Sequence, residues 1–250
     1  MAALILFFTV SHTRAQQLPR IAIIIDDLGY ELALGRRATE LPGPVACAVL
    51  PGTPRGRTLA MAANERGKEV LLHLPLQALQ SDGKVEPGGI MLDMSRSEFA
   101  ETFAKDFESV PHAIGVNTHR GSLLTRHPGH MAWLMEEISR RGKLIFIDSY
   151  TTNESIALQF ARESGVPAVR RDIFLDPDPS PETVTREFAR LKQLARKRGM
   201  AVAIGHPYPA TIELLERELP RLAEEGFELI SISELVELKT IAGRPDSAAP

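Results

Sequence analysis

The chain has 250 residues, of which 44% are hydrophobic and 24% are charged, and its formal net charge is -3. This length suits one large domain or two small ones with a substantial core. Lysines and arginines are spread along the chain, which gives no indication of a nucleic-acid partner. The single cysteine, Cys47, excludes an intrachain disulfide and a cysteine-based zinc site.

Residues 1–17 have features of a secretory signal peptide. Ala2–Val10 is an apolar run, too short for the roughly 20 residues that span a bilayer but suitable as a signal h-region. Thr13–Ala15 offers a small-residue cleavage site, although a basic n-region is missing apart from the terminal amine. We therefore expect a periplasmic or secreted protein with no transmembrane segment in the mature chain. The alternative is a disordered or docked N-terminal arm.

Apolar, β-rich runs alternate with amphipathic helical patterns over residues 18–240. The helical patterns cover 53–67, 95–110, 127–142, 153–165, 180–199 and 208–226, and Ser95 and Glu98 have capping-box spacing at the second start. Strands alternating with helices imply a parallel sheet with right-handed crossovers. The predicted strands are Ile21–Ile25, Val45–Leu50, Val70–Leu72, Ala113–Val116, Leu144–Ile147, Ala168–Val169, Ala201–Ile204 and Leu229–Ile232.

The fold class that this order predicts is α/β, a distorted (β/α) barrel with about seven strands. No G-x-G-x-x-G follows the first strand and there is no Walker A sequence, so nucleotide binding loses its main support. The Gly-rich connection from Gln80 to Asp93 is either a surface loop or a wall of the site. Residues 241–250 are expected to form a disordered tail.

Polar side chains stand where most of the predicted strands end. In a barrel the carboxyl ends of the strands open into one mouth, where chemistry collects, so we expect these residues to converge there. They are Asp26, Asp27, His73, Asn117, His119, Asp148, Ser149, Asp172 and His206.

One carboxylate with two imidazoles, leaving positions open for water and substrate, is typical of a catalytic metal set. Mixed nitrogen and oxygen ligands favour zinc. A second carboxylate then serves as general base and a histidine across the mouth as general acid, which indicates metal-assisted hydrolysis. Glycoside hydrolysis by two acids leaves the histidines without a role. A serine triad through Ser122 or Ser149 lacks the G-x-S-x-G elbow.

Six stretches resemble the divergent polysaccharide deacetylases in order and spacing. They are "IAIIIDDLGY", "VLPGTP", "EVLLHLPLQ", "GVNTHRGSLLT", "FIDSYTT" and "AIGHPYP", and the resemblance covers about Leu18 to Val236. It implies a distorted (β/α) barrel with seven or so strands, location in the periplasm or cell envelope, and a deacetylase-like site with a divalent metal. The expected activity is removal of acetyl groups from an envelope polysaccharide or related glycan.

The resemblance also implies residue roles. The ordinary family's second motif, H-x-x-x-H, is incomplete here because Gln77 stands four residues after His73, and His119 is the natural replacement ligand. The implied metal ligands are thus Asp27, His73 and His119. The implied catalytic residues are Asp26 as base, His206 as acid and Asp148 as the group that orients a neighbour.

Asn117, Arg120 and Ser122 are the predicted substrate-binding residues. Arg120 either binds an anionic substrate group or is solvated, and Asn117 either contacts substrate or holds its loop through hydrogen bonds. Because the second motif departs from the family pattern, there is an alternative to the enzyme hypothesis. In this alternative the protein is a catalytically inactive periplasmic glycan- or partner-binding protein on the same barrel.

Overall fold

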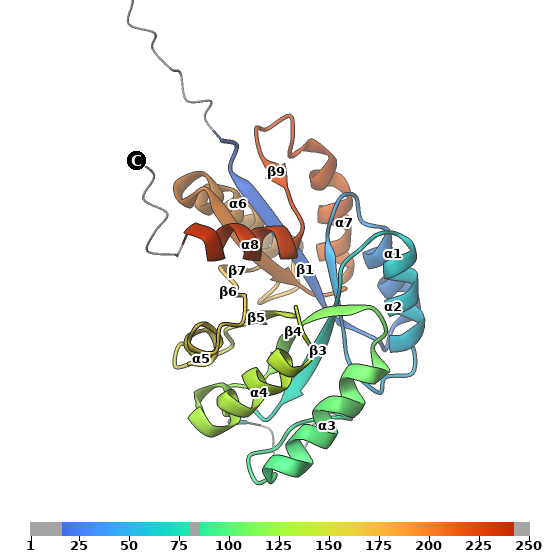
Figure 1. Ribbon diagram of the computed structural model, residues 1–250. Coiled ribbons are helices and arrows are strands. Elements are labelled where there is room, and N and C mark those ends of the chain that lie inside the picture. Colours follow the sequence, from blue (N-terminus) through green and yellow to red (C-terminus); the bar gives the residue numbers. More distant parts are fainter. Residues whose placement is uncertain (1–16, 81–85, 243–250) are drawn as a thin grey trace, which may run out of the picture.

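The computed structural model describes residues 17–80 and 86–242, and its centre is one curled parallel sheet (Figure 1). The strand order is β6-β5-β4-β3-β2-β1-β8-β7, and β9 pairs with β1. The predicted barrel is therefore confirmed, although it is open between β6 and β7. The strands are β1 (Arg20–Leu28), β2 (Ala46–Val49), β3 (Val70–Leu76), β4 (Ala113–Arg120), β5 (Ile145–Asp148), β6 (Ala168–Arg170), β7 (Ile173–Phe174), β8 (Met200–Gly205) and β9 (Glu228–Leu229).

The sheet of the described residues has nine strands, where about seven were expected. The two-residue strand β7 is too short to give a pattern of its own in the sequence. The last predicted strand, Leu229–Ile232, is partly wrong, because β9 ends at Leu229 and Ile232 begins a helix. Ile232 packs with the inner face of the sheet from that helix, so its apolar character reflects burial and not a strand.

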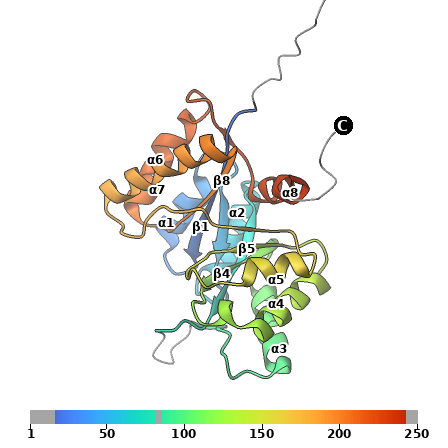
Figure 2. The same ribbon diagram turned by 90° about the vertical axis from the view of Figure 1, so that its left-hand side faces the viewer.

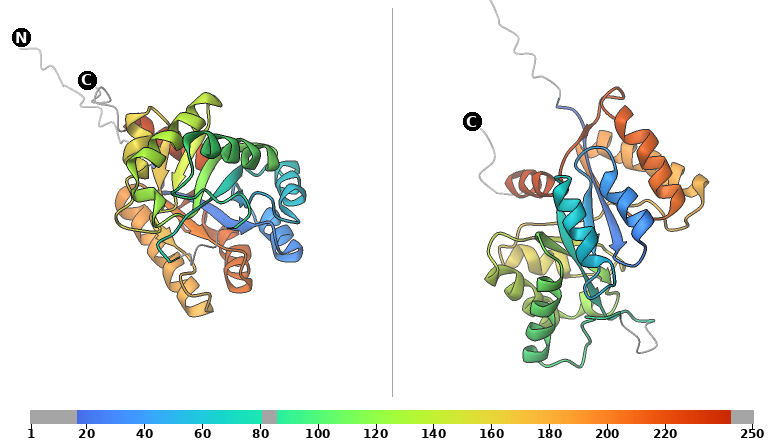
Figure 3. Two further views of the ribbon diagram at one scale, coloured as in Figure 1. Left: turned by 90° about the horizontal axis from the view of Figure 1, so that it is seen from below. Right: turned by 90° about the vertical axis from the view of Figure 1, so that its right-hand side faces the viewer.

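Most helices pack on the outer face of the sheet, whereas the last helix, α8, packs on the inner face (Figures 2 and 3). The sequence pattern did not predict α1 or α8. The Ser95 capping box at the start of α3 is confirmed. The helices are α1 (Leu32–Glu40), α2 (Gly56–Glu65), α3 (Arg96–Ser109), α4 (Pro128–Arg140), α5 (Ala157–Glu163), α6 (Pro181–Arg198), α7 (Pro209–Glu218) and α8 (Ile232–Ala242), with 3-10 turns η1 (Leu124–Arg126) and η2 (Leu219–Arg221).

Alternation of side chains along each strand divides the core in two. On β1, Ile21, Ile23 and Ile25 pack outward against the helices, whereas Ala22 and Ile24 pack inside the curl. The inner cluster is completed by Leu235 and other residues of α8, which lies across the sheet from α6 and α7 (Figure 2). Each fully buried isoleucine contributes roughly 1.5–3 kcal/mol, so both faces of the wall stabilise the strands.

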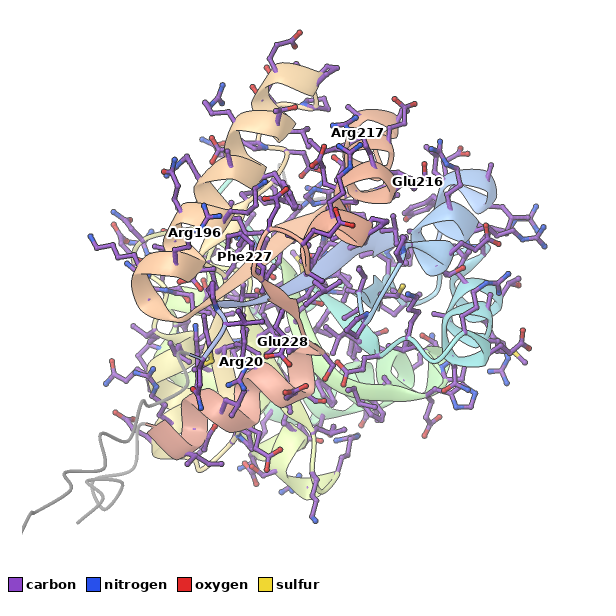
Figure 4. All side chains as sticks on the ribbon, turned by 90° about the horizontal axis from the view of Figure 1, so that it is seen from above. Arg20, Arg196, Glu216, Arg217, Phe227 and Glu228 are labelled. Carbon is purple, nitrogen blue, oxygen red and sulfur yellow. The ribbon has the colours of Figure 1, made fainter. Side chains whose placement is uncertain are left out.

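The ends of the described chain are tied to the sheet. Arg20 at the start of β1 pairs with Glu228 of β9 at 2.9 Å, and the Arg196 guanidinium lies 4.5 Å from the centre of the Phe227 ring (Figure 4). Helix α8 extends to Ala242, so residues 241 and 242, expected in a disordered tail, are helical. The rest of that tail and residues 1–16 of the predicted signal lie outside the described residues. Among those described, no helix is both long and apolar enough to span a bilayer.

The turn after β1 requires glycine at residue 29. Gly29 has φ +145°, and a Cβ there would lie 2.1 Å from the Thr53 hydroxyl oxygen. We expect Gly29→Ala to lower the free energy of unfolding by roughly 2–3 kcal/mol, because backbone strain and steric overlap add. The measurement is urea denaturation followed by circular dichroism.

Gly67 provides the matched control, since its φ is +70° but nothing lies within 4 Å of a Cβ built there. Gly67→Ala should cost only about 1 kcal/mol, the strain of a left-handed alanine. Equal losses of stability in the two variants would show that the contact with Thr53 has no effect.

Candidate metal centre

Asp26 and Asp27 end β1, and a backbone irregularity turns both carboxylates toward the mouth of the barrel. Asp26 follows Ala22 and Ile24 on the inner face and is 2% exposed. Asp27 would point outward by simple alternation, but the β1–β2 register shifts between Ile25 and Leu28, and Asp27 has φ +58°. A bulge with a left-handed residue re-aims a side chain. This is how two adjacent carboxylates reach the same site.

Three ligand atoms from three strands form a small triangle at this mouth. Asp27 Oδ1 lies 3.1 Å from His73 Nε2 and 2.9 Å from His119 Nδ1, and the two ring nitrogens are 3.0 Å apart. Ligands at 2.0–2.1 Å around a tetrahedral zinc are about 3.4 Å from one another, so a small outward movement of each would admit such an ion. The structure thus brings together the three residues predicted as metal ligands.

The chemistry of these donors fits a cation. His73 Nδ1 is 2.9 Å from the Asn117 side-chain oxygen, and the Asn117 amide donates to Asp26 Oδ1 at 2.7 Å. A carboxylate accepts, so the Asn117 amide is oriented with its oxygen toward His73 and makes Nδ1 a donor. Loss of the proton from Nε2 then leaves that nitrogen, beside Asp27, available to a cation. Asp27 Oδ1 is buried and makes no well-directed hydrogen bond, as suits a ligand atom.

The far nitrogen of His119 faces a carboxylate from the Gln80–Asp93 connection. Glu86 Oε2 lies 3.3 Å from His119 Nε2, a close contact that is not a well-directed hydrogen bond, and Glu86 Oε1 lies 3.1 Å from the Arg120 guanidinium. A carboxylate on the second nitrogen of a ligating histidine sets its tautomer and raises its basicity. The described end of that connection is therefore a wall of the site. Glu86 had no recognisable signal in the sequence, because its loop carries no motif.

His206 stands across the mouth and is oriented by Asp176, which sequence reasoning missed. Asp176 accepts from His206 Nδ1 at 2.9 Å, from the His206 amide at 2.7 Å and from the Thr211 hydroxyl at 2.7 Å. His206 Nε2 is then free toward the site, 3.8 Å from Asp27 Oδ2. Asp176 follows Phe174 by two residues, so strand alternation after β7 would have found it had that strand been recognised.

Asp148, predicted to act in catalysis by orienting a neighbour, lies on the other face of its strand. Ile145 and Ile147 pack inside the curl, so Asp148 alternates outward. Its oxygens accept from the Tyr150 amide at 2.9 Å and from the Ser155 hydroxyl at 2.8 Å. It therefore positions the Tyr150 turn, whereas Asp176 orients His206.

The three predicted substrate-binding residues differ in their position relative to the cavity at the mouth. Arg120 lines a cavity of about 350 Å³ at the mouth, whereas Asn117 is fully buried beneath it and supports Asp26 and His73. Ser122 accepts from the Leu79 amide at 3.1 Å and is not part of the cavity wall. Among the described residues, neither Ser122 nor Ser149 is hydrogen-bonded to a histidine. The cavity wall includes Asp26, His73, His119, Tyr150, Arg171 and His206.

The remaining polar residues near the strand ends have structural contacts. Gln77, at the position of the missing second-motif histidine, accepts from the Leu92 amide through its side chain at 2.8 Å and so holds the Gln80–Asp93 connection. Asp172 accepts from the Val202 amide and pairs with Arg198 and Lys239. Neither residue lies with the three ligand atoms.

Burial and charge together set the protonation of the site. Burial raises the pKa of Asp26, which suits a general base. Burial alone would lower the pKa of His73, but the Asp26 and Asp27 carboxylates outweigh it and raise that pKa to about 9. For Asp27, burial is outweighed by contacts with His119 and His73, which hold its pKa well below the usual range. Burial is likewise outweighed at His206, whose pKa is raised by Asp176 and by the carboxylates.

Comparison with known proteins identifies the family. A sequence model of the divergent polysaccharide deacetylases matches residues 23–236. The chain belongs to this family. An uncharacterized protein of Haemophilus influenzae is 36% identical over 216 residues, which are 86% of this chain and 76% of that protein. The family assignment thus extends over the whole barrel.

Solved structures show the same fold at low sequence identity. An uncharacterized protein, ATU2773, of Agrobacterium tumefaciens has a TM-score of 0.83 at 20% identity, covering 88% of this chain and 90% of that one. A mutant of BA3943 of Bacillus anthracis, a CE4 family pseudoenzyme with restored enzymatic activity, has a TM-score of 0.51 at 14% identity, covering 88% and 68%. The same barrel fold thus occurs in proteins of very different sequence.

The contact of Glu86 with His119 should matter for metal affinity. We expect Glu86→Gln to weaken zinc binding about 10- to 100-fold, because the histidine loses the carboxylate that orients it. Isothermal titration calorimetry with zinc measures this. Asp93→Asn, an exposed carboxylate of the same connection, is the control and should bind zinc as the wild type does. Unchanged affinity in both would contradict a role for Glu86.

Zinc binding should release at least one proton at pH 7. His73 carries a proton below a pKa of about 9, and a ligating imidazole must be neutral. The apparent affinity should therefore rise about tenfold per pH unit between pH 6 and 8. Titrations in two buffers of different ionisation enthalpy count the released protons. An affinity that stays flat over this range would contradict the assignment of His73 as a ligand.

Proposed function

We propose that the protein is a metal-dependent hydrolase that removes acetyl groups from an envelope polysaccharide or related glycan. The observation that carries the proposal is the convergence of Asp27, His73 and His119, with Asp26 and His206 beside them. Membership of the divergent polysaccharide deacetylase family supports the substrate class. Zinc is the metal we propose, from the mixed nitrogen and oxygen donor set.

A divalent cation held by Asp27, His73 and His119 would polarise the acetyl carbonyl and make water more acidic. Asp26 takes a proton from the attacking water, and the Asn117 amide holds its carboxylate in place. His206 gives a proton from Nε2 to the leaving amine or alcohol, while Asp176 holds Nδ1. Base and acid thus come from β1 and from the end of β8, on neighbouring strands.

A metal-free glycosidase fits the geometry less well. Two catalytic acids of a glycosidase flank the bond to be cleaved and stand about 5–10 Å apart across an open cleft. Here Asp26 and Asp27 both approach the same nitrogen, His73 Nε2, at 3.6 and 3.1 Å. The carboxylates therefore share one imidazole and leave no space for a sugar between them.

We also propose that the protein acts in the periplasm or outside the cell. Support comes from the apolar run Ala2–Val10 and the small residues after it. This location gives access to envelope glycans. Detection of the tagged protein in a periplasmic extract, with loss of residues 1–17 by mass spectrometry, is the corresponding measurement.

Substitution of Asp26 and of Asp27 should affect acetate release and zinc binding differently. We expect Asp26→Asn to lower acetate release about 10²- to 10⁴-fold while zinc still binds, because only the base is lost. Asp27→Asn should lose both zinc and activity. Acetate is measured by a coupled enzymatic assay on a panel of N- and O-acetylated oligosaccharides, and zinc by calorimetry.

Asp93→Asn is again the control and should release acetate at the wild-type rate. Full activity of Asp26→Asn would remove the proposed base. If the wild type binds zinc and glycan but frees no acetate from any member of the panel, the inactive glycan-binding protein becomes the better account. Activity that survives a chelator would favour the glycosidase class.

A further inference from the structure

The open side of the barrel forms a second cavity beside the metal centre. Strands β6 and β7 are the two ends of the strand order, and the chain crosses between them at Arg171 and Asp172. No strand ladder closes this seam in the described sheet. Helix α6 lies over the outer side of the seam. A cavity of about 430 Å³ lies between α6 and the β6–β7 connection. We call it the seam cavity.

Cations dominate the wall of the seam cavity. Asp172 is the one acidic residue in the described wall, and it is already paired with Arg198 at 3.1 Å. Lys197 makes no ion pair with any described residue. The Arg170 guanidinium lies 4.1 Å from the centre of the Tyr150 ring and makes no ion pair with a described carboxylate, although the buried Asp148 interacts with Arg170 and Arg171 at longer range. The positive wall residues are Arg170, Arg171, Arg190, Lys197 and Arg198.

Neighbouring acids cancel only part of this charge. Arg190 contacts Glu187 at 2.6 Å, and Glu187 also pairs with Arg186 at 3.2 Å. One carboxylate thus serves two guanidinium groups. The whole chain has a formal net charge of -3, so the excess of cations at the seam is local. Arg196 of the same helix lies over Phe227, away from this wall (Figure 4).

The seam cavity adjoins the mouth of the candidate metal centre. Tyr150 and Arg171 line both cavities. Arg171 is held by its bonds to the Ser149 carbonyl at 2.7 Å and the Tyr150 carbonyl at 2.9 Å. Tyr150 has φ +51°, a strained conformation that Asp148 supports through the Tyr150 amide. The junction between the two cavities is therefore built and held in place.

We propose that the substrate is an anionic glycan, whose acidic groups bind in the seam cavity while an acetyl group lies at the metal centre. This inference rests on the proposed deacetylase function. Guanidinium groups bind carboxylate and phosphate through paired hydrogen bonds, so either group on the sugar fits the wall. A polymer that extends from the mouth over Tyr150 meets Arg170 first and then the α6 cations.

Binding of matched charged and neutral glycans tests this. The probes are a hyaluronan hexasaccharide and its carboxyl-reduced form, and pentamannose 6-phosphate and its dephosphorylated form. We expect at least one charged probe to bind the zinc-loaded protein ten times more tightly than its neutral partner, with affinity falling as salt rises. Which pair shows the difference tells carboxylate from phosphate. Calorimetry measures each affinity.

Substitutions in the wall of the seam cavity test whether its cations cause the preference for charged probes. Arg190→Gln with Lys197→Gln should remove most of the tenfold preference, and Arg190→Glu with Lys197→Glu should remove all of it. Lys143→Glu with Arg221→Glu is the control, since both are exposed and make no ion pair with a described residue. These variants should keep the wild-type preference. Circular dichroism verifies that each variant is folded.

Three results of the binding experiments overturn the inference: equal binding of charged and neutral probes, equal loss in the control variant, or tighter binding of a single-stranded DNA hexanucleotide through the same cations. Acetate release from an acidic acetylated glycan at a rate that the seam variants leave unchanged also overturns the inference and keeps the deacetylase. Charged-glycan binding that depends on the seam, with no acetate released, keeps the anionic-glycan site and overturns the hydrolase. The two proposals therefore fail separately.

Discussion

Side chains alternate between the two faces of every strand, and this constraint decides which polar residues reach the mouth of the barrel, except at Asp27, which the irregularity in β1 turns inward. Along one strand, the side chains on the inner face are apolar near its amino end and polar at its carboxyl end. In each case the polar residue follows an apolar one by two positions. The pairs are Ile24 and Asp26, Leu71 and His73, and Ile204 and His206. The register then brings these ends together, since His73 lies opposite Asn117 on the neighbouring strand. The candidate metal centre is thus a continuation of the inner core, with carboxylate and imidazole side chains in place of apolar ones.

Burial of charged side chains at this centre has a free-energy cost. Asp26 and His73 are each 2% exposed, and burying a charge is costly unless it is paired and hydrogen-bonded. Asn117 satisfies both at once by accepting from His73 and donating to Asp26. The two carboxylates in turn raise the pKa of His73, so a cation at this site would replace its proton. The same buried carboxylates favour a divalent cation, because its positive charge would offset theirs.

The opening of the barrel between β6 and β7 has a separate consequence. A closed barrel would seal the wall by strand pairing, but here α6 covers the seam with its cationic side and leaves a cavity. The left-handed residues Asp27, Arg120 and Tyr150 all stand at strand ends around the mouth, where strain is tolerated because neighbouring contacts hold the backbone. Metal centre and seam cavity share Tyr150 and Arg171, so the geometry connects the proposed chemistry to the proposed choice of substrate.

The sequence by itself determined the strand–helix order and the barrel and indicated the polar strand ends, because hydrophobic period and strand-end polarity are local signals. The three predicted ligands came from the family resemblance, and the structure places these residues together. It did not reveal α1, α8 or β7, whose residues lack a clear period or are too few. Only the tertiary structure decided that Asp176 and not Asp148 orients His206, that Glu86 reaches His119, and that α6 cations line an open seam. These contacts join residues 30 or more positions apart in the chain, and their partners depend on strand register and loop path, which no local pattern encodes.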